Sequence, residues 1–360
     1  MTIVLRSLVV RSGATTLVDG VGLRLAPGSR TALVGASGAG KSLTCAALAG
    51  TLPAGLEVSG SLTVEPDGAG SAAGSCGDEK ATDLPGSGGA GATHGSRAED
   101  GRGNEDGGRR AGGDGHRAPD GSARAGRDRP ASPPSGTNLL GLPAAMRPRH
   151  GRIALVSQDH STALHPLIPV GRQIALAARA GGSRPGETRR RTEDALGAVG
   201  LEAALGERVP GRLSGGQRQR AALALALAGR PSVLIADEPT TALDVLARAE
   251  ILDLLTRLTS ADAAGGSDGA DGAQSAPVIP DSPALLLITH DLPAAAICEN
   301  VVVLHAGAVI ERGPTARVLA RPEHPVTVAM CEAAAEETLT GALRAVAAQQ
   351  GLNTPSGLVA

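Results

Sequence analysis

The stretch Gly35-Ala36-Ser37-Gly38-Ala39-Gly40-Lys41-Ser42 decides how this chain folds. It follows the short apolar run 31–34 and leads into residues 42–49, which favour a helix, so a glycine-rich turn joins a buried strand to a helix start. Glycines let backbone N–H groups converge on phosphate oxygens, and the helix N-terminus adds positive potential. We therefore predict a phosphate-binding loop in which Lys41 reaches the β- and γ-phosphates and Ser42 holds Mg²⁺. The residues expected to contact the nucleotide here are Gly35, Ser37, Gly38, Gly40, Lys41 and Ser42.

A second feature is an apolar strand that ends in two acids. Residues 233–236 are apolar and are followed by Asp237 and Glu238. Burying such charges is costly unless they face an ion or a reacting water. We predict that Asp237 supports Mg²⁺ and that Glu238 orients and polarises the attacking water as a general base. The structural alternative is a pair of solvated acids at an exposed strand end.

A third feature is the string Leu213-Ser214-Gly215-Gly216-Gln217, which precedes the apolar helical run 221–228. It forms a second helix start suited to phosphate. One nucleotide does not need two such cradles, so we expect the second to bind a nucleotide held by another subunit. The expected contacts are Ser214, Gly215, Gly216 and Gln217.

With this string the sequence resembles the nucleotide-binding subunits of ABC transporters, and the resemblance covers the chain outside two insertions. It implies an α/β P-loop NTPase fold with a mainly parallel central sheet, an antiparallel β subdomain and an α-helical subdomain. It also implies ATP and Mg²⁺ as cofactors. Gln158 matches the Q-loop, which implies contact with metal and water and coupling to a membrane partner. Asp244 matches the D-loop, implied to cross a dimer interface, and His290 matches the switch histidine, implied to contact the γ-phosphate.

Two segments narrow the resemblance. Residues 157–166 look like the Q-loop region of peptide and nickel importers, and residues 321–327 are similar to their C-terminal segment, although Val326 stands where an aromatic is usual. The family normally stacks adenine on an aromatic residue, and Ser12, beside Arg11, falls at that place. The chain has no Phe, Tyr or Trp at all. We expect the phosphate chemistry to survive this loss, while base selectivity is in doubt.

The organisation of the chain follows from composition. Polar, glycine-rich stretches with few large apolar side chains cannot bury enough surface to offset their ordering entropy. We predict a single ABC ATPase domain over 1–360 that contains disordered insertions at 66–136 and 260–283. The resemblance adds a helical subdomain at 159–222 with the Q-loop and the signature, and a C-terminal hairpin and helical tail at 301–360. The expected strands are 3–10, 21–25, 31–34, 153–156, 233–236, 285–289, 301–304 and 308–310, and the expected helices are 42–49, 221–228 and 247–258.

Charge and hydropathy exclude several classes of protein. The chain has 34 basic and 36 acidic residues, a net charge of −2, which excludes a nucleic-acid binder that acts through bulk positive charge. No apolar run approaches the roughly 18 residues of a membrane-spanning helix. The first ten residues look like a strand and not like a cleaved leader. The four cysteines have no metal-ligand spacing. We therefore expect a cytoplasmic protein, peripheral on the inner face of the membrane through its partner.

These features lead to one expected function and two alternatives. The expected function is an ATPase subunit that energises an importer of peptides, nickel or a similar small solute. Its expected partners are permease subunits in separate chains, a second ATPase subunit (identical or paralogous) and a solute-binding protein, with no nucleic acid. One alternative is a soluble ABC-type ATPase acting on DNA or ribosomes, although the paired cassettes, coiled-coil arms and zinc modules of those relatives are missing. The other is a catalytically impaired cassette, which the absence of aromatic residues would suit.

Overall fold

The computed structural model describes residues 1–67, 137–143, 146–148, 151–157, 163–241, 243–260 and 282–336. All of them belong to one compact unit, Met1–Ala69 with Ser132–Ala360. Gln158 lies outside the described residues, as do both predicted insertions except for their end residues and the predicted tail beyond residue 336. No helix in the described ranges is long and apolar enough to cross a membrane.

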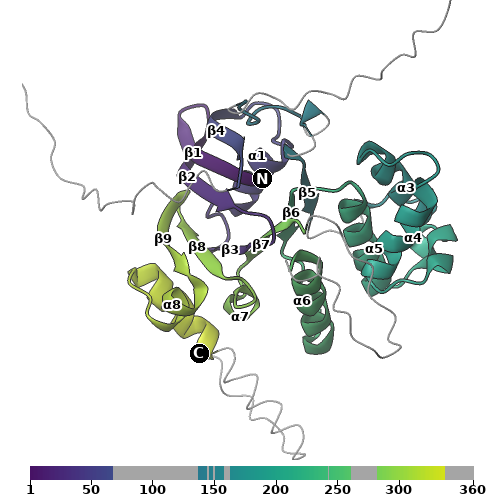
Figure 1. Ribbon diagram of the computed structural model, residues 1–360. Helices are drawn as coiled ribbons and strands as arrows, with labels where there is room; N and C mark the ends of the chain where they lie inside the picture. The colour runs from purple at the N-terminus through teal and green to yellow at the C-terminus, as the bar shows by residue number, and fades with distance from the viewer. Residues whose placement is uncertain are drawn as a thin grey trace, which may run out of the picture. The chain divides into compact units, whose positions relative to one another are not determined.

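A six-stranded sheet forms the centre of this unit, with the strand order β5-β6-β7-β3-β8-β9 (Figure 1). Neighbouring strands are parallel except that β9 runs antiparallel to β8. The parallel strands are almost entirely apolar, because both faces of the sheet are covered. Their bounds are β3 Arg30–Val34, β5 Ile153–Val156, β6 Val233–Asp237, β7 Ala284–Thr289, β8 Asn300–His305 and β9 Ala308–Pro314.

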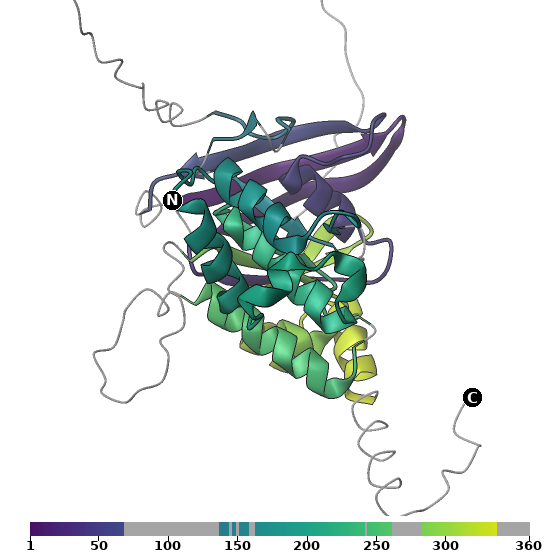
Figure 2. The same cartoon turned by 90° about the vertical axis from the view of Figure 1, so that its right-hand side faces the viewer.

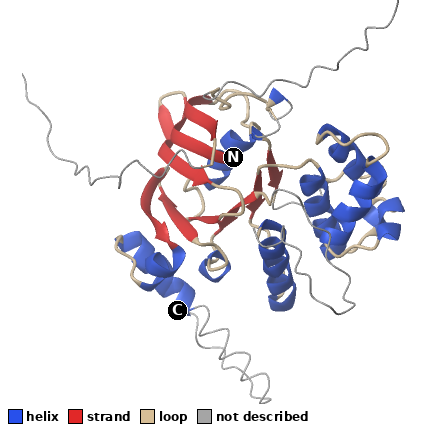
Figure 3. Cartoon of the chain, in the orientation of Figure 1, coloured by secondary structure: helices blue, strands red, loops and turns tan. Residues whose placement is uncertain are grey.

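A separate antiparallel sheet has the order β2-β1-β4 (Figure 3). Its strands are β1 Thr2–Ser12, β2 Thr15–Leu25 and β4 Glu57–Glu65. The strands β1 and β2 are longer than predicted, and the sequence reasoning did not identify β4. Its alternating pattern is interrupted at Gly60, where a Cβ atom would lie 2.7 Å from the carbonyl oxygen of Ser7. A glycine at such a close approach between strands hides the strand signal.

The helices lie on both sides of the central sheet (Figures 1 and 2). They are α1 Lys41–Ala49, α3 Val170–Ala180, α4 Thr188–Ala198, α5 Gly215–Ala228, α6 Val245–Thr259, α7 Leu292–Ala295 and α8 Thr315–Ala320, with short 3-10 turns at Ala203–Glu207 and Pro210–Arg212. The helices α3, α4 and α5 pack on one another. The helices α3 and α4 lie within 159–222, the range of the predicted helical subdomain, whereas α5 begins in that range and continues to Ala228.

Two aliphatic clusters hold the layers together. Successive residues of the central strands point to opposite faces, so Leu234 packs into one cluster and Ile235 into the other. One cluster joins the sheet to α5 and α6, and the second joins it to α1 and the antiparallel sheet. Each fully buried Leu, Ile or Val contributes roughly 1.5–3 kcal/mol. This layered core fixes the strand ends at which the chemistry lies.

Candidate functional site

The loop between β3 and α1 is shaped by three glycines. A Cβ atom at Gly35 would lie 2.3 Å from the carbonyl oxygen of Leu304 at the end of β8. Gly40 has a φ of +98°, and a Cβ there would lie 3.2 Å from a methyl group of Val18. Gly38, with a φ of +78°, faces open space. A side chain would be too close to neighbouring atoms at Gly35 and Gly40, and the backbone is left-handed at Gly38 and Gly40. These two conditions explain why the loop has glycine at these positions.

The β8–β9 turn supports this loop from behind. The N–H of Gly307 donates to the carbonyl of Ala39 at 3.2 Å, and the N–H of Asp19 donates to the carbonyl of Gly307 at 2.8 Å. Gly307 has a φ of +83°, and a Cβ there would lie 2.6 Å from the carbonyl oxygen of Leu17. Both sheets therefore fix the position of the loop.

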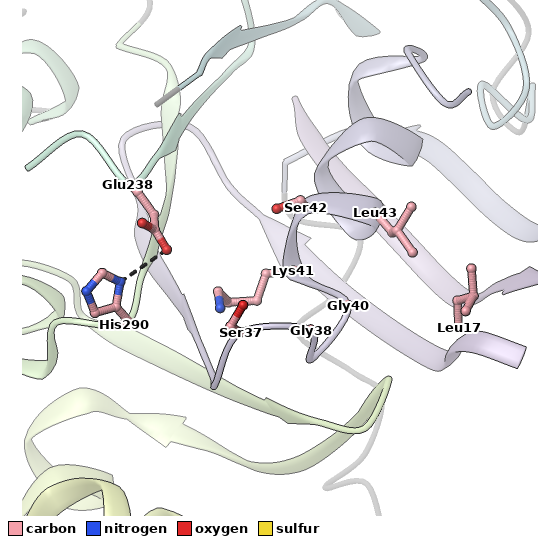
Figure 4. A pocket seen from close by; sticks show the side chains of 9 residues that line it. All are labelled: Leu17, Ser37, Gly38, Gly40, Lys41, Ser42, Leu43, Glu238 and His290. Atoms are coloured by element: carbon pink, nitrogen blue, oxygen red, sulfur yellow. Dashed lines mark hydrogen bonds and ion pairs between the residues drawn. The ribbon is translucent and has the colours of Figure 1, made fainter. Parts of the chain in front are cut away.

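Lys41, the first residue of α1, is buried against the loop, with 7% of the residue exposed. Its ammonium Nζ donates to the carbonyls of Gly35 at 2.7 Å and Ala36 at 3.0 Å. The next residue, Ser42, presents an exposed hydroxyl at the same helix start (Figure 4). A positive charge, oriented backbone N–H groups and a hydroxyl thus converge at one place, as phosphate binding requires.

Glu238 faces this loop from the end of β6 (Figure 4). Its carboxylate accepts a hydrogen bond from Thr241 Oγ1 at 3.0 Å and lies 3.1 Å from His290 Nδ1. Its backbone φ is +47°, a left-handed conformation that costs a non-glycine residue about 1 kcal/mol or more. The N–H of Glu238 donates to the carbonyl of Ile288 on β7 at 2.9 Å, which helps to hold this strained position.

The two adjacent acids have pKa values displaced in opposite directions. Burial, together with the neighbouring Glu238 charge, raises the pKa of Asp237 against the opposing effect of Lys41. Burial alone would also raise the pKa of Glu238, but hydrogen bonds from His290 and Thr241 and the positive charges nearby outweigh it and lower the pKa. A carboxyl group whose pKa is lowered from 4.5 is ionised at neutral pH, so Glu238 is in the form that can accept a proton from water.

A pocket of about 700 Å³ lies between these groups. It brings together seven predicted site residues, from three separate parts of the sequence, with two leucines. Gly35, at the start of the loop, and Asp237, the last residue of β6, are not among its lining residues. The lining residues are Leu17, Ser37, Gly38, Gly40, Lys41, Ser42, Leu43, Glu238 and His290 (Figure 4).

The Ser214–Gln217 segment begins α5 and is built as a capping box. The N–H of Gln217 donates to Ser214 Oγ at 3.2 Å, and the N–H of Ser214 donates to Gln217 Oε1 at 3.1 Å. A Cβ atom at Gly215 or Gly216 would meet nothing within 4 Å. Glycine in a helix costs up to about 1 kcal/mol relative to alanine, so the contacts within this chain give no reason for either glycine.

This second cradle has its own pocket of about 500 Å³, which Ser214, Gly216 and Gln217 line with Arg208 and other residues. The two pockets share no lining residue. Asp244 lines neither of them: it caps α6, and its Oδ1 accepts a hydrogen bond from the N–H of Ala247 at 2.8 Å. The described part of one chain therefore keeps the two predicted phosphate cradles apart.

Two side-chain contacts join the functional segments inside the chain. Buried Gln219 on α5 donates from Nε2 to the carbonyl of Pro239, directly after Glu238, at 2.6 Å. Arg248 on α6 donates to Asp291, directly after His290, at 2.8 Å. The helix that follows the second cradle is thus tied to the acidic strand end.

Leu17 is a pocket residue that sequence reasoning missed. Val10 pairs with Val18 and Arg11 pairs with Thr16, so Leu17 is an extra residue in a β-bulge. A bulge of this kind re-aims a side chain, here into the pocket. Ser12 lies further along, paired with Thr15, and does not line the pocket. The signal in the sequence was the break in alternation at the adjacent apolar pair Leu17-Val18.

The chain's oxygen donors suit a divalent cation. Ser42 supplies a hydroxyl, and Asp237 supplies a half-buried carboxylate at the end of β6. Among the residues that the structure describes, no cluster of three or more His, Cys, Asp or Glu side chains could hold a metal alone. Mg²⁺ commonly takes one or two protein ligands and completes its shell with substrate phosphates and water, so this donor set fits it.

Comparison with known proteins agrees with the family resemblance seen in the sequence. Residues 131–241 match the ABC transporter family. The chain is 38% identical over 189 residues to the dipeptide transport ATP-binding protein DppD of Escherichia coli, which covers 51% of this chain and 52% of that protein. It is 40% identical over 203 residues to a probable peptide ABC transporter ATP-binding protein, y4tR, of Sinorhizobium fredii, which covers 54% of each chain. The chain thus spans about half the length of these curated relatives.

Solved structures resemble the fold over a longer range. CbiO1 of Clostridium perfringens, part of an ABC transporter complex, matches with a TM-score of 0.54 at 21% identity over 89% of this chain and 90% of that one. A dimeric structure of the bacterial ABC transporter cassette MJ0796 matches with a TM-score of 0.53 at 19% identity over 87% and 98%. The predicted P-loop NTPase fold is confirmed, and the relatives confirm the resemblance to peptide importers.

Proposed function

We propose, from the match of residues 131–241 to the ABC transporter family, that this chain is the ATP-hydrolysing subunit of a membrane transporter. The observation that carries the proposal is the pocket in which Lys41 and the phosphate loop face the Glu238–His290 pair. The relatives named for peptide transport support import of peptides, within the wider expectation of peptides, nickel or a similar small solute. No observation favours the soluble ATPase alternative. The permease subunits would be separate chains at the inner face of the membrane, with a solute-binding protein as a further partner.

The chemistry follows from the protonation and position of the side chains. Glu238 is ionised and held by Thr241 and His290, so its carboxylate can orient a water molecule and accept its proton. His290 lies 3.1 Å from Glu238 through Nδ1 and lines the same pocket, so its ring faces the space that the terminal phosphate would occupy. Lys41 supplies positive charge at the base of the loop, where charge builds up on the transferred phosphoryl group.

Ser42 and Asp237 are the residues that would hold Mg²⁺, with Gln158 as the predicted further ligand. When bound, the ion would neutralise charge on the β- and γ-phosphates. The raised pKa of Asp237 is consistent with this role, because a nearby cation would stabilise the ionised carboxylate that burial disfavours.

The second cradle is proposed to complete the site of a second ATPase subunit. Gly215 and Gly216 are exposed, and no contact among the described residues of their own chain explains them. A glycine at a helix start permits another backbone or a phosphate to approach closely. Asp244 precedes Val245 and Leu246, which are 81% and 78% exposed, as an apolar contact between two subunits would use.

Phosphate release by the full chain with Mg²⁺ and ATP tests the proposal. Glu238→Gln should lower turnover by about 10²-fold or more, because a general base contributes about 10²–10⁴-fold. Glu193→Gln on α4, whose carboxylate forms only an exposed pair with Arg189, is the matched control and should keep full turnover. Equal turnover in both variants would contradict the role of Glu238, and absence of turnover in the unmodified chain would favour an impaired cassette. Co-purification of a multi-span membrane protein would support the permease partner.

A further inference from the structure

The pocket has a polar end and an aliphatic end. Glu238, His290 and Lys41 lie on one side of the phosphate loop, and Leu17 and Leu43 lie on the other (Figure 4). A triphosphate bound with its terminal phosphate toward Glu238 would place its sugar and base toward the two leucines. Neither leucine side chain has a hydrogen-bond donor or acceptor.

Leu17 is held in this position by its backbone. The bulge adds it between the Val18 and Thr16 pairings, and the side chain is half-buried. Its carbonyl oxygen lies where a Cβ atom on Gly40 would be 3.3 Å away and one on Gly307 2.6 Å away. The residue therefore packs its main chain on the phosphate loop and turns its side chain into the pocket.

The sequence contains no Phe, Tyr or Trp, and the one ring among the residues that line the pocket is His290, which lies at the polar end beside Glu238. A second copy of the chain likewise brings no Phe, Tyr or Trp. Stacking on an aromatic ring raises affinity about 5- to 140-fold in other base-binding sites. Strong discrimination between similar ligands requires polar groups that are left unpaired by the wrong ligand. The two leucines supply neither effect.

We propose that this pocket selects its ligand by the triphosphate group and not by the base, so that its substrates are purine and pyrimidine nucleoside triphosphates alike. The inference rests on the proposed function and names its substrate class. Leu17 provides an apolar surface that all four nucleotides contact to a similar extent. Affinity then comes from the loop, Lys41 and the metal-bound phosphates.

Competition binding tests the proposal with the full-length Glu238→Gln protein in the presence of Mg²⁺. ATP, GTP, CTP, UTP and AMP would each displace the fluorescent probe trinitrophenyl-ATP. The expected result is that the four triphosphates have Kd values within about threefold of one another, while AMP binds at least tenfold more weakly. A tenfold or greater preference for ATP would overturn the inference and leave the proposed function standing. If no triphosphate displaced the probe, both would be overturned.

Two substitutions at Leu17 test the position of the base. Leu17→Ala should weaken the binding of all four triphosphates by a similar factor, on the order of fourfold. Leu17→Trp should create a stacking surface and favour ATP and GTP over CTP and UTP by at least about fivefold. Thermal unfolding followed by circular dichroism checks that both variants fold. Unchanged affinities in two folded variants would overturn the assignment of Leu17 to the base end.

Discussion

Gly216→Ala separates a role in assembly from a role in folding. Gly216 lies in the first turn of α5, directly after the capping box formed by Ser214 and Gln217. The new methyl group would meet no atom of this chain within 4 Å, and the backbone is not left-handed. Nothing in the described part of the chain therefore opposes alanine at this position.

The expected effect on stability is small and favourable. Alanine stabilises a helix interior by up to about 1 kcal/mol relative to glycine, and we expect a gain of about 0.5 kcal/mol in the first turn. For a domain of this size, that corresponds to a rise in Tm of about 1–2 °C. If the glycine faces a nucleotide bound to a second subunit, the methyl group enters a close contact there. Overpacking costs about 1–3 kcal/mol, so ATP turnover should fall about 5- to 140-fold.

The assay measures both quantities on the same preparations. Circular dichroism at 222 nm gives Tm, and phosphate release gives turnover. Gly186→Ala is the matched control, since a Cβ there also meets nothing within 4 Å and its residue lies far along the chain from Ser214; it should leave both unchanged. Full turnover in Gly216→Ala would refute the reasoning. A fall in Tm of several degrees would show instead that the glycine serves the local fold.

Three further predictions concern the support of the site. Gly307→Ala should lower the free energy of unfolding by at least about 2 kcal/mol, because its Cβ would lie 2.6 Å from the carbonyl oxygen of Leu17. Urea unfolding followed by circular dichroism measures this change, and an unchanged midpoint would contradict the prediction. Asp237→Asn should be more stable than the unmodified chain at pH 7, because burial raises the pKa of Asp237 and disfavours its charge. The stability advantage of the variant should be absent below pH 3.8, the usual pKa, should grow as the pH rises through the folded-state pKa, and should then stay constant. Urea unfolding at several pH values measures it, and an advantage that does not change with pH would contradict the prediction. Gln219→Leu leaves the carbonyl of Pro239 without its buried hydrogen-bond donor. The variant should therefore have a free energy of unfolding about 1–3 kcal/mol lower in the same urea assay, and a lower ATP turnover. If both quantities were unchanged, the proposed link between α5 and the acidic strand end would be contradicted.

Local chemistry made much of the site predictable from the sequence. The phosphate loop and the acids after β6 depend on residues that are adjacent in the chain, and parallel strands bring their carboxyl ends to one edge. Lys41, Glu238 and His290 accordingly lie around one pocket, although they come from distant parts of the chain. Gln158 lies outside the described residues, so its role stays a prediction.

Long-range packing was harder to predict. The position of Leu17 depends on a one-residue slip between β1 and β2, which periodicity alone does not specify. Arg147 is a second example, because this buried residue donates to the carbonyls of Leu48 and Leu142 and so helps to satisfy the end of α1. Its segment rejoins the fold about a hundred residues after α1, and no local pattern marks that partner.

The central claim is that two phosphate cradles from two chains close around one nucleotide. Size-exclusion chromatography of Glu238→Gln tests it most directly, with detection by refractive index because the chain has no aromatic residue. We predict a shift from monomer to dimer with Mg²⁺ and ATP, no shift with ADP, and no shift when Lys41→Ala is added. A protein that binds ATP under these conditions and elutes as a monomer would contradict the claim.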